Sequence, residues 1–585
     1  MDLDTLFQDE FNYFKLLARD FSSHFSELDD FFSPSAADPG VERLIEGAAF
    51  LFARLRQKID DEFPEITQGL LREVWSTPLR PLPATSVVEF KADDDEETFF
   101  IPAGAQIKGY SDEDEYTFIT RRDLTVLPLT IIRKNVTHAT DGTRITLSFK
   151  ANFKKEKQSF PQCIPLFLSS DSTAAGFFTL WLKHHLAEAI LFCNNVSYPL
   201  PSEIISFQSP KPESLVYPGD SQQFWRLQLL QEFFYTPHVN DFAYLDLKII
   251  NNICALNSID DFSIELKFNK ILPPDCSVDE NSFRLYCTPI INLFNNRVSA
   301  IPFAGNKPGE HHHLSYQVLP NKESYWLSAI CKVYSPAEIT DSERGEIQIF
   351  KPMSEFLPTR FDSDVESYYY ELRLEKDVSD KPAWFISFFD SKGEPVNVTA
   401  RKNFICEIEC VNNESVLNLN VGDVNVPGSD IPGNLTFENI TPLSTPYSLQ
   451  AEKHWPVISH LSLSPLLLND KATIQQVVKD FDIHADSNLP QHEKHKRYLS
   501  GIAEVSSEPI DRLIEGFPVR GLRFDLHLDP SCYLNEGEMY RFGSVLADFF
   551  AYCISDSSFI TTTLINVQSG ERLPLAPIQG TRTQI

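Results

Sequence analysis

A run of three adjacent histidines, at positions 311–313, is the first group that could do chemistry, because imidazole is a common metal ligand. On a strand, neighbouring side chains point to opposite faces, so the three rings could not all face one ion. Gly309 and Glu310 precede the run and favour a loop. No carboxylate or cysteine stands at a ligand-like offset, so we expect no metal at this run.

A second histidine pair, His492 and His495, resembles the zinc-protease motif HExxH, but its histidines are three residues apart instead of four. Pro490 lies just before the pair and disfavours a continuous helix through it. We therefore expect no metal here either. The stretch 482–496 is predicted to be a polar linker.

The remaining chemical motifs are missing from the sequence. It contains no GxGxxG, no GxxxxGK[ST] and no GxSxG, so neither a phosphate-binding loop nor a nucleophile elbow is predicted. Cys406 and Cys410 would lie about 13 Å apart on one face of a strand, too far for a disulfide. We predict no catalytic, cofactor-binding or metal-binding residue. A β-rich glycoside hydrolase that uses two carboxylates stays open as the alternative.

Composition limits the classes of function further. The chain has 585 residues, with Lys+Arg 51 and Asp+Glu 82, which gives a net charge of −31. Such a charge argues against binding to nucleic acid or to anionic lipid. We expect partners with basic surfaces and a salt-dependent assembly. Ten scattered cysteines without a CxxC pair favour a reducing compartment, and no apolar run is long enough to span a membrane.

The elements that must position any interaction surface begin with a helical head, residues 1–82. Phenylalanines recur there at steps of four and three, which places them on one face of a helix. The partner-interface candidates are Phe7, Phe11, Phe14, Phe21 and Phe25. The alternative is that this stripe forms the core of the head itself. A break at 33–35 separates it from a second predicted helix, which ends near 60–64 and is followed by a third over 65–75.

The body after the prolines at 78–83 is predicted to be rich in strands up to about residue 449. Expected strands are 145–149, 242–247, 262–268, 384–388 and 404–410, with helices over 174–189 and 222–232. The C-terminal part mixes a helix over 472–481, a strand over 520–528, a helix over 538–553 and a strand over 559–567. The predicted class is α+β, with domains over 1–82, 83–330, 331–454 and 455–585.

Several sequence blocks carry a family resemblance. The segment ADPGVERLIE (37–46), followed by KIDDEFPE (58–65), resembles the opening signature of the TssF (VasA/ImpG) family. Further blocks in family order are LLQEFF (229–234), CTPIINLF (287–294), Trp455 with ISHLSL (458–463), Arg520-Gly521 and GSVLADFFAY (543–552). These blocks span nearly the whole chain.

The resemblance implies a structural role in the type VI secretion system. Members are similar to phage baseplate wedge proteins and are not enzymes. Two copies of the chain are expected to bind one TssG-like subunit and to join TssE- and TssK-like subunits. Six such wedges would surround the spike hub. The resemblance further implies a bacterial cytoplasmic protein that meets the inner-membrane complex only through partners.

Overall fold

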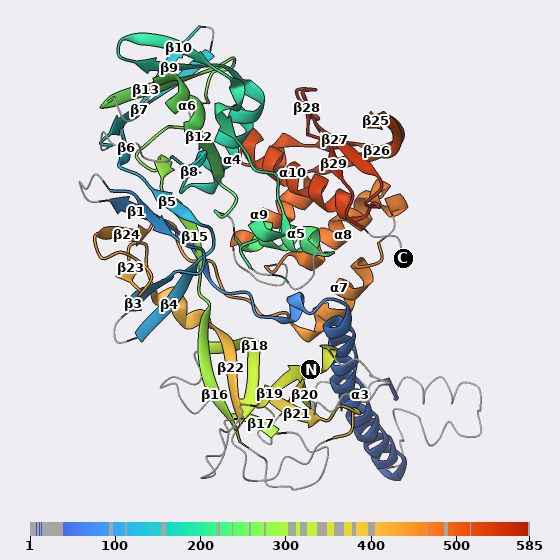
Figure 1. The fold of residues 1–585 in the computed structure, drawn as a ribbon. Helices are drawn as coiled ribbons and strands as arrows, with labels where there is room; N and C mark the ends of the chain where they lie inside the picture. Colours follow the sequence, from blue (N-terminus) through green and yellow to red (C-terminus); the bar gives the residue numbers. More distant parts are fainter. Residues whose placement is uncertain are drawn as a thin grey trace, which may run out of the picture. The chain divides into compact units, whose positions relative to one another are not determined.

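The structure is a computed structural model, drawn as a ribbon in Figure 1. The chain divides into two compact units. The first comprises Met1–Leu79 and Leu449–Ser462, and the second Arg80–Ser448 and Leu463–Ile585. Helices and strands are mixed, which confirms the predicted α+β class. The division into four domains stays a prediction. The structure describes residues 7, 8, 11, 13, 14, 39–92, 97–111, 114–140, 142–153, 160–217, 219, 223–236, 238–254, 256, 259–273, 276–301, 312–315, 325–335, 348–355, 368–376, 382–395, 404–463, 465–484, 490–514 and 516–582.

One long helix, α3 (Pro39–Val74), dominates the described part of the first unit. The predicted break at 60–64 is wrong, because Pro64 lies inside a continuous helix. An interior proline removes one backbone hydrogen bond, but the sequence on both sides is rich in good helix formers. A short helix from far along the chain, α7 (His454–His460), packs against α3.

The second unit contains a six-stranded sheet assembled from distant parts of the sequence. Its order is β23 (Val424–Pro427), β3 (Gln106–Ser111), β4 (Asp114–Thr120), β15 (Cys287–Ile291), β1 (Thr85–Ala92) and β24 (Leu435–Asn439). Strand β1 pairs antiparallel with β15 on one side and β24 on the other. Every residue of β15 is buried. The sheet therefore joins the two ends of the predicted β-rich body.

Two further sheets are formed by strands from the N-terminal half of this unit's sequence. The five-stranded sheet has the order β10 (Val196–Leu200), β9 (Leu186–Cys193), β13 (Asp261–Phe268), β7 (Gly142–Ala151) and β6 (Leu129–Ala139). The four-stranded sheet has the order β11 (Ile205–Ser206), β12 (Phe242–Asp246), β8 (Cys163–Ser169) and β14 (Ser282–Leu285), and β2 (Phe99–Ile101) pairs with β5 (Leu124–Val126). Strands β6 and β14 are thus edge strands.

A closed barrel follows along the chain. Its order is β16 (Phe294–Ile301), β17 (His312–Ser315), β21 (Pro382–Phe389), β20 (Tyr368–Lys376), β19 (Gln348–Pro352), β18 (Tyr325–Ser335) and β22 (Phe404–Asn412). His312 and His313 lie on β17, so the loop predicted there is wrong, and His311 lies outside the described residues. Cys406 and Cys410 are free, buried thiols of the barrel core, as predicted. Burial raises the pKa of each to about 12.

The C-terminal part of the second unit is a sheet packed against helices. The strands are β25 (Ile502–Ile514), β26 (Phe517–Leu528), β27 (Phe559–Asn566), β28 (Arg572–Pro574) and β29 (Ile578–Gln579). The helix α10 (Glu536–Tyr552) connects the parallel strands β26 and β27 and contacts α4 (Ser172–Leu180) and α5 (Trp225–Tyr235). The helix predicted over 538–553 and the flanking strands are confirmed.

Two other predictions from local sequence patterns, the helix over 174–189 and the polar linker over 482–496, are wrong. The helix predicted over 174–189 ends early: α4 stops at Leu180, a π-helical turn covers Trp181–His185, and β9 begins at Leu186. Pairing of β9 with β10 and β13 overrides the local preference. The predicted polar linker contains a helix, α9 (Pro490–Ser500), with Pro490 in its first turn, where proline is tolerated. The second unit also contains the short helices α6 (Leu247–Cys254) and α8 (Lys471–Phe481).

Candidate interaction surfaces

The helix α3 leaves many large apolar side chains exposed. They are Leu44, Phe50, Leu51, Phe52, Ile66, Leu70 and Val74. Near the C-terminal end of α3, two sets of residues with a spacing of four differ in burial. Thr67 and Leu71 are buried, as is Trp75 directly after the helix, whereas Ile66, Leu70 and Val74 are exposed. Exposed apolar surface of this extent on one element is typical of a protein–protein contact.

The buried line of α3 meets α7. Thr67 Oγ1 and the Nδ1 atom of His454 lie 3.3 Å apart in a buried position. Val457 and His460 of α7 are buried as well. Since these residues lie almost 400 positions apart in sequence, periodicity alone could not pair them. The contact fixes which side of α3 is internal to the first unit.

The predicted phenylalanine stripe lies partly against α3. The rings of Phe7 and Phe11 are stacked with centroids 5.7 Å apart, and Phe7 lies 6.5 Å from Phe50. The ring of Phe14 meets Phe52 edge-on at 5.2 Å. Even so, Phe50 and Phe52 are 45% and 50% exposed. Phe21 and Phe25 lie outside the described residues. The assignment of the stripe to a partner interface stays a prediction.

Buried charges join α5 to α10 inside the second unit. Arg226 of α5 forms an ion pair with Asp548 of α10 and stacks 4.3 Å from the ring of Trp225. Burial raises the pKa of Asp548 to about 6, although the pair with Arg226 opposes this shift. Breaking one member of a buried pair leaves an uncompensated charge. The pair therefore specifies how the two helices pack.

Glu232 of α5 is a fully buried carboxyl group. The main-chain N–H of Tyr217 donates to its Oε1 at 3.1 Å. Burial raises its pKa to about 7, with backbone hydrogen bonds from Tyr217 and Val216 opposing the shift. Sequence reasoning missed this group, because a glutamate within an amphipathic helix is usually solvated. Its only local signal is its place inside the apolar block 229–234.

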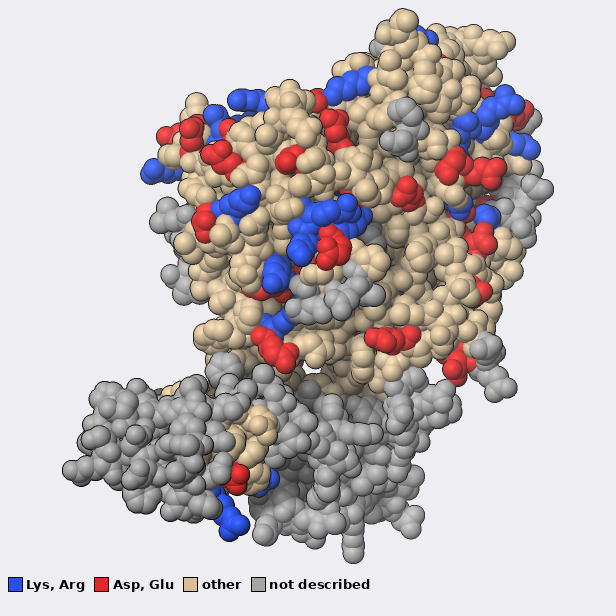
Figure 2. Space-filling model, turned by 180° about the vertical axis from the view of Figure 1, so that it is seen from behind, with Lys and Arg blue, Asp and Glu red and all other residues tan. Residues whose placement is uncertain are grey.

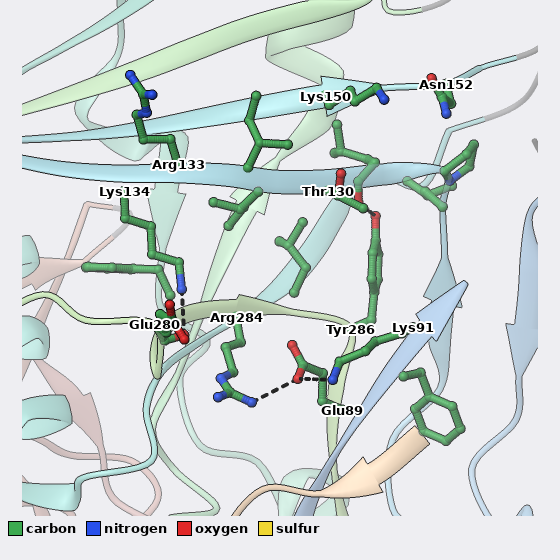
Figure 3. Close-up of a pocket in the computed structure, with 18 of the residues that line it drawn as sticks. Glu89, Lys91, Thr130, Arg133, Lys134, Lys150, Asn152, Glu280, Arg284 and Tyr286 are labelled. Atoms are coloured by element: carbon green, nitrogen blue, oxygen red, sulfur yellow. Dashed lines mark hydrogen bonds and ion pairs between the residues drawn. The ribbon is translucent and has the colours of Figure 1, made fainter. Parts of the chain in front are cut away.

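A groove lined by many charged side chains lies between several strands of the second unit (Figure 3). It encloses about 890 Å³ and is lined by residues of β1, β6, β14 and β24. Its cationic side chains are Lys91, Arg133, Lys134, Lys150 and Arg284. The same lining carries the carboxylates Glu89, Asp279, Glu280 and Glu438, so positive and negative side chains are nearly balanced there. No sequence pattern predicts the groove, since these cations come from three separate stretches of the chain.

Ion pairs and hydrogen bonds connect several charged side chains of the groove. Glu89 accepts from Arg284 Nη1 at 2.9 Å, and Glu438 accepts from Lys91 Nζ at 2.8 Å. Lys134 Nζ donates to the main-chain oxygen of Glu280 at 2.8 Å. Burial, together with the nearby guanidinium of Arg284, lowers the pKa of Lys134. The carboxylates of Glu89, Asp279 and Glu280 oppose this shift.

Figure 2 shows the charged side chains on one face of the molecule. On the face drawn in Figure 2, small groups of basic and acidic side chains are separated by wide uncharged areas. Within the described ranges, no three His, Cys, Asp or Glu side chains gather closely enough to hold a metal ion. None of the described helices has the length and apolar content to cross a bilayer.

Comparison with known proteins identifies the family. Residues 1–582 match the family model described as "Type VI secretion system, TssF". The chain belongs to the TssF family. It is 25% identical, over an alignment of 640 residues covering 99% of both chains, to the type VI secretion system component TssF1 of Pseudomonas aeruginosa PAO1. The predicted resemblance is thus confirmed.

Two solved structures share the fold of this TssF chain. One belongs to a TssK-TssF-TssG baseplate subcomplex and matches with a TM-score of 0.71 at 22% identity, covering 92% of this chain and 98% of that one. The other belongs to a baseplate complex of the type VI secretion system and matches with a TM-score of 0.59 at 20% identity, covering both chains fully. The mixed α+β fold of this chain is thus one found in such assemblies.

Proposed function

We propose that this TssF protein is a structural subunit of the baseplate wedge of a type VI secretion system. The observation that carries the proposal is the family match over residues 1–582. The fold shared with chains of two baseplate complexes supports it. Within the wedge, two copies would bind one TssG-like subunit and contact TssK- and TssE-like subunits. Six wedges would enclose the spike hub in the cytoplasm.

The comparisons lend no support to the alternative, a carboxylate-dependent glycoside hydrolase. Such an enzyme needs two acids about 5 to 9.5 Å apart in an open cleft. Among the described residues, the carboxyl groups with raised pKa values are those of Glu232 and Asp548. Glu232 accepts main-chain N–H groups, and Asp548 pairs with Arg226. Both arrangements fit a role in positioning α5 and α10.

The exposed apolar face of α3, continued by the phenylalanine stripe, is the surface that we assign to the TssG-like subunit. An amphipathic helix that inserts its apolar face into a helical groove is a common recognition mode. Burying each large apolar side chain contributes about 1.5–3 kcal/mol. Several such side chains on one helix would therefore support a stable contact.

Co-purification with the TssG-like subunit tests this assignment. The double variant Leu44→Glu with Leu51→Glu should lower capture at least about tenfold, because a buried unpaired carboxylate costs several kcal/mol. Arg43→Glu is the matched control, since it adds an acid at an exposed polar position of the same helix. Equal capture by the double variant and the control would place the interface elsewhere.

Truncating the stripe separates its two possible roles. In Phe14→Ala with Phe21→Ala, a partner interface predicts loss of capture with unchanged circular dichroism. A core role predicts loss of helical signal together with loss of capture, and that result would contradict the assignment.

A further inference from the structure

We infer that β25 is a contact site for a second copy of this chain, in which the two β25 strands pair antiparallel about a twofold axis centred on Ile510. The contact lies in the second unit and is separate from α3. It does not depend on the TssG-like subunit, so the free chain is sufficient to test it. Three features of β25 support it: its free edge, the exposed apolar tip of its hairpin and the order of its charges.

The hairpin of β25 and β26, labelled in Figure 1, extends beyond the rest of its sheet. Among the described residues, β25 pairs only with β26 and ends the sheet order. The pairing of β26 with β27 begins at Gly521. Within the described part of the chain, residues 511–520 therefore form a two-stranded arm about 15 Å long. A two-stranded ribbon is only marginally stable in water, so a third strand would stabilise it.

The tip of this arm is apolar and exposed. Leu513 and Phe517 are each 73% exposed. Leu513 lies opposite Pro518, and alternation places it on the same face of the hairpin as Ser507 and its cross-strand neighbour Phe524. Phe524 is fully buried in the sheet. The apolar face of the C-terminal sheet thus continues along the arm into solvent, where another chain can cover it.

The outer edge of β25 offers main-chain groups for pairing. Proline has no N–H, and the pairs Leu513 with Pro518 and Pro509 with Leu522 have the same parity along the hairpin. These are therefore the non-hydrogen-bonded pairs of the ladder, at which the main-chain groups of β25 point away from β26. Leu513, residue 511 and residue 507 can each donate and accept along this edge, whereas Pro509 can only accept.

The charges along β25 select one antiparallel register. Charged residues and proline on an edge strand limit its pairing with other chains. Pairing centred on Glu508, Asp511 or Arg512 would place identical charges opposite each other, and pairing centred on Pro509 would oppose two prolines. Centred on Ile510, Glu508 of each copy lies opposite Arg512 of the other, and the two isoleucines meet. The strand is thus complementary to itself, as a twofold contact requires.

The local charge balance also favours a second copy as the occupant. Two chains of net charge −31 repel each other, but residues 511–520 contain two acids and two bases and are neutral. Among the described residues, neither Glu508 nor Arg512 forms an ion pair. A different protein would need opposite charges at the same spacing along a free strand. A second copy supplies them by symmetry.

Analytical ultracentrifugation of the free chain tests the pairing. Wild type should sediment as a concentration-dependent dimer. Arg512→Glu places two carboxylates opposite each other at both ends of the contact and should weaken dimerisation at least about tenfold. Arg572→Glu on β28 is the matched control, since it reverses an exposed arginine at the other end of the sheet order. A wild-type chain that stays monomeric up to about 0.1 mM, or equal dimerisation of the two variants, would overturn the inference.

Mixing two variants tests the register. Glu508→Arg places arginines opposite each other, so it should also weaken dimerisation at least about tenfold. In an equimolar mixture with Arg512→Glu, each arginine of one chain lies opposite a glutamate of the other. Differently tagged copies should therefore form a heterodimer within about threefold of the wild-type affinity. Absence of this heterodimer, with unchanged thermal midpoints of both variants, would overturn the register.

A cysteine on the proposed axis tests the position of the contact. A non-hydrogen-bonded pair has its Cα atoms about 4.5 Å apart, within the range of a disulfide. Ile510→Cys should therefore crosslink two copies when diamide takes one hydrogen from each thiol. Ser506→Cys, exposed on the same face of β25, is the matched control, because its two copies would lie about 26 Å apart. Crosslinking of Ile510→Cys no greater than that of Ser506→Cys or of wild type would overturn the axis.

Discussion

The helices α3 and α10 have similar sequence patterns but different surroundings. Both place aromatic and aliphatic residues at helical spacing, and each lies in one of the two compact units. In α10 the large apolar side chains Phe542, Leu546, Phe549 and Phe550 are fully buried. In α3, Leu44 and Leu51 are 74% and 67% exposed. Helical periodicity therefore identifies an apolar face without identifying what covers it.

The difference follows from what each helix meets within its own unit. The helix α10 lies between two strands of the C-terminal sheet in sequence and contacts α4, α5 and both strands. Phe550, for example, packs 4.8 Å from Phe524 of β26. The described residues of the first unit offer α3 mainly the short helix α7 and the aromatic rings of the N-terminal stripe. A long helix with so little cover is suited to contact another subunit.

The largest difference in stability between variants should come from truncating one apolar residue in each helix. Phe542→Ala should lower stability by about 3–5 kcal/mol, because it opens a cavity among Phe233, Tyr498 and Tyr533. Leu51→Ala should change it by less than about 0.5 kcal/mol. Thermal midpoints of the free chain measure both. A substantial loss in Leu51→Ala would show that α3 is covered within the free chain.

Substituting a glycine in each helix tests the same difference in packing between α10 and α3. A Cβ atom at Gly537 of α10 would lie 2.2 Å from the main-chain nitrogen of Phe177, so Gly537→Ala must push α4 and α10 apart. We expect a loss of about 3 kcal/mol. Gly69 of α3 has nothing within 4 Å of such an atom, and Gly69→Ala should stabilise α3 by about 0.5–1 kcal/mol through helix propensity. Rates of amide hydrogen exchange in α10 and α3 measure the two changes in stability. Similar losses of stability in both variants would contradict the difference in packing.

The pH dependence of stability tests whether Glu232 of α5, which packs against α10, is buried as a neutral acid. The pKa of Glu232 is raised from 4.5 to about 7, so its stabilising contribution is complete below pH 4.5 and is lost as the pH rises through about 7. Glu232→Gln stays neutral and should avoid this loss. We expect the variant to gain about 2 kcal/mol relative to wild type between about pH 5 and about pH 8. Parallel thermal midpoints across that range would show that Glu232 is not buried as a neutral acid.

Local periodicity predicted the elements whose neighbours lie close in sequence. The strand at 520–528, the helix at 538–553 and the strand at 559–567 follow one another and pack together, so local preference and tertiary contact agree. The predictions at 60–64 and 482–496 were wrong because proline was taken to end a helix. Pro64 lies inside α3, and Pro490 begins α9.

The interaction surfaces were harder to predict for a different reason. The phenylalanine stripe is visible in sequence, but its contacts with Phe50 and Phe52 depend on how two helices meet. The groove of the second unit gathers cationic side chains from positions 91, 133–150 and 284, and its existence depends on strand order. Strand order among distant segments is set by tertiary packing, which single-sequence periodicity does not encode.

The smallest expected effect concerns the contact that holds α7 against α3. Thr67 Oγ1 lies 3.3 Å from Nδ1 of His454, and both residues are buried. Thr67→Val keeps the shape of the side chain and removes the hydroxyl, so it should cost about 1 kcal/mol. Thr67→Ser retains the hydroxyl and is the matched control. Because α7 joins this unit from far along the chain, the loss should appear as faster amide exchange in α7 while α10 stays unchanged. Equal exchange in the valine and serine variants would show that apolar packing of Leu71 and Val457, without the hydroxyl, holds the two helices together.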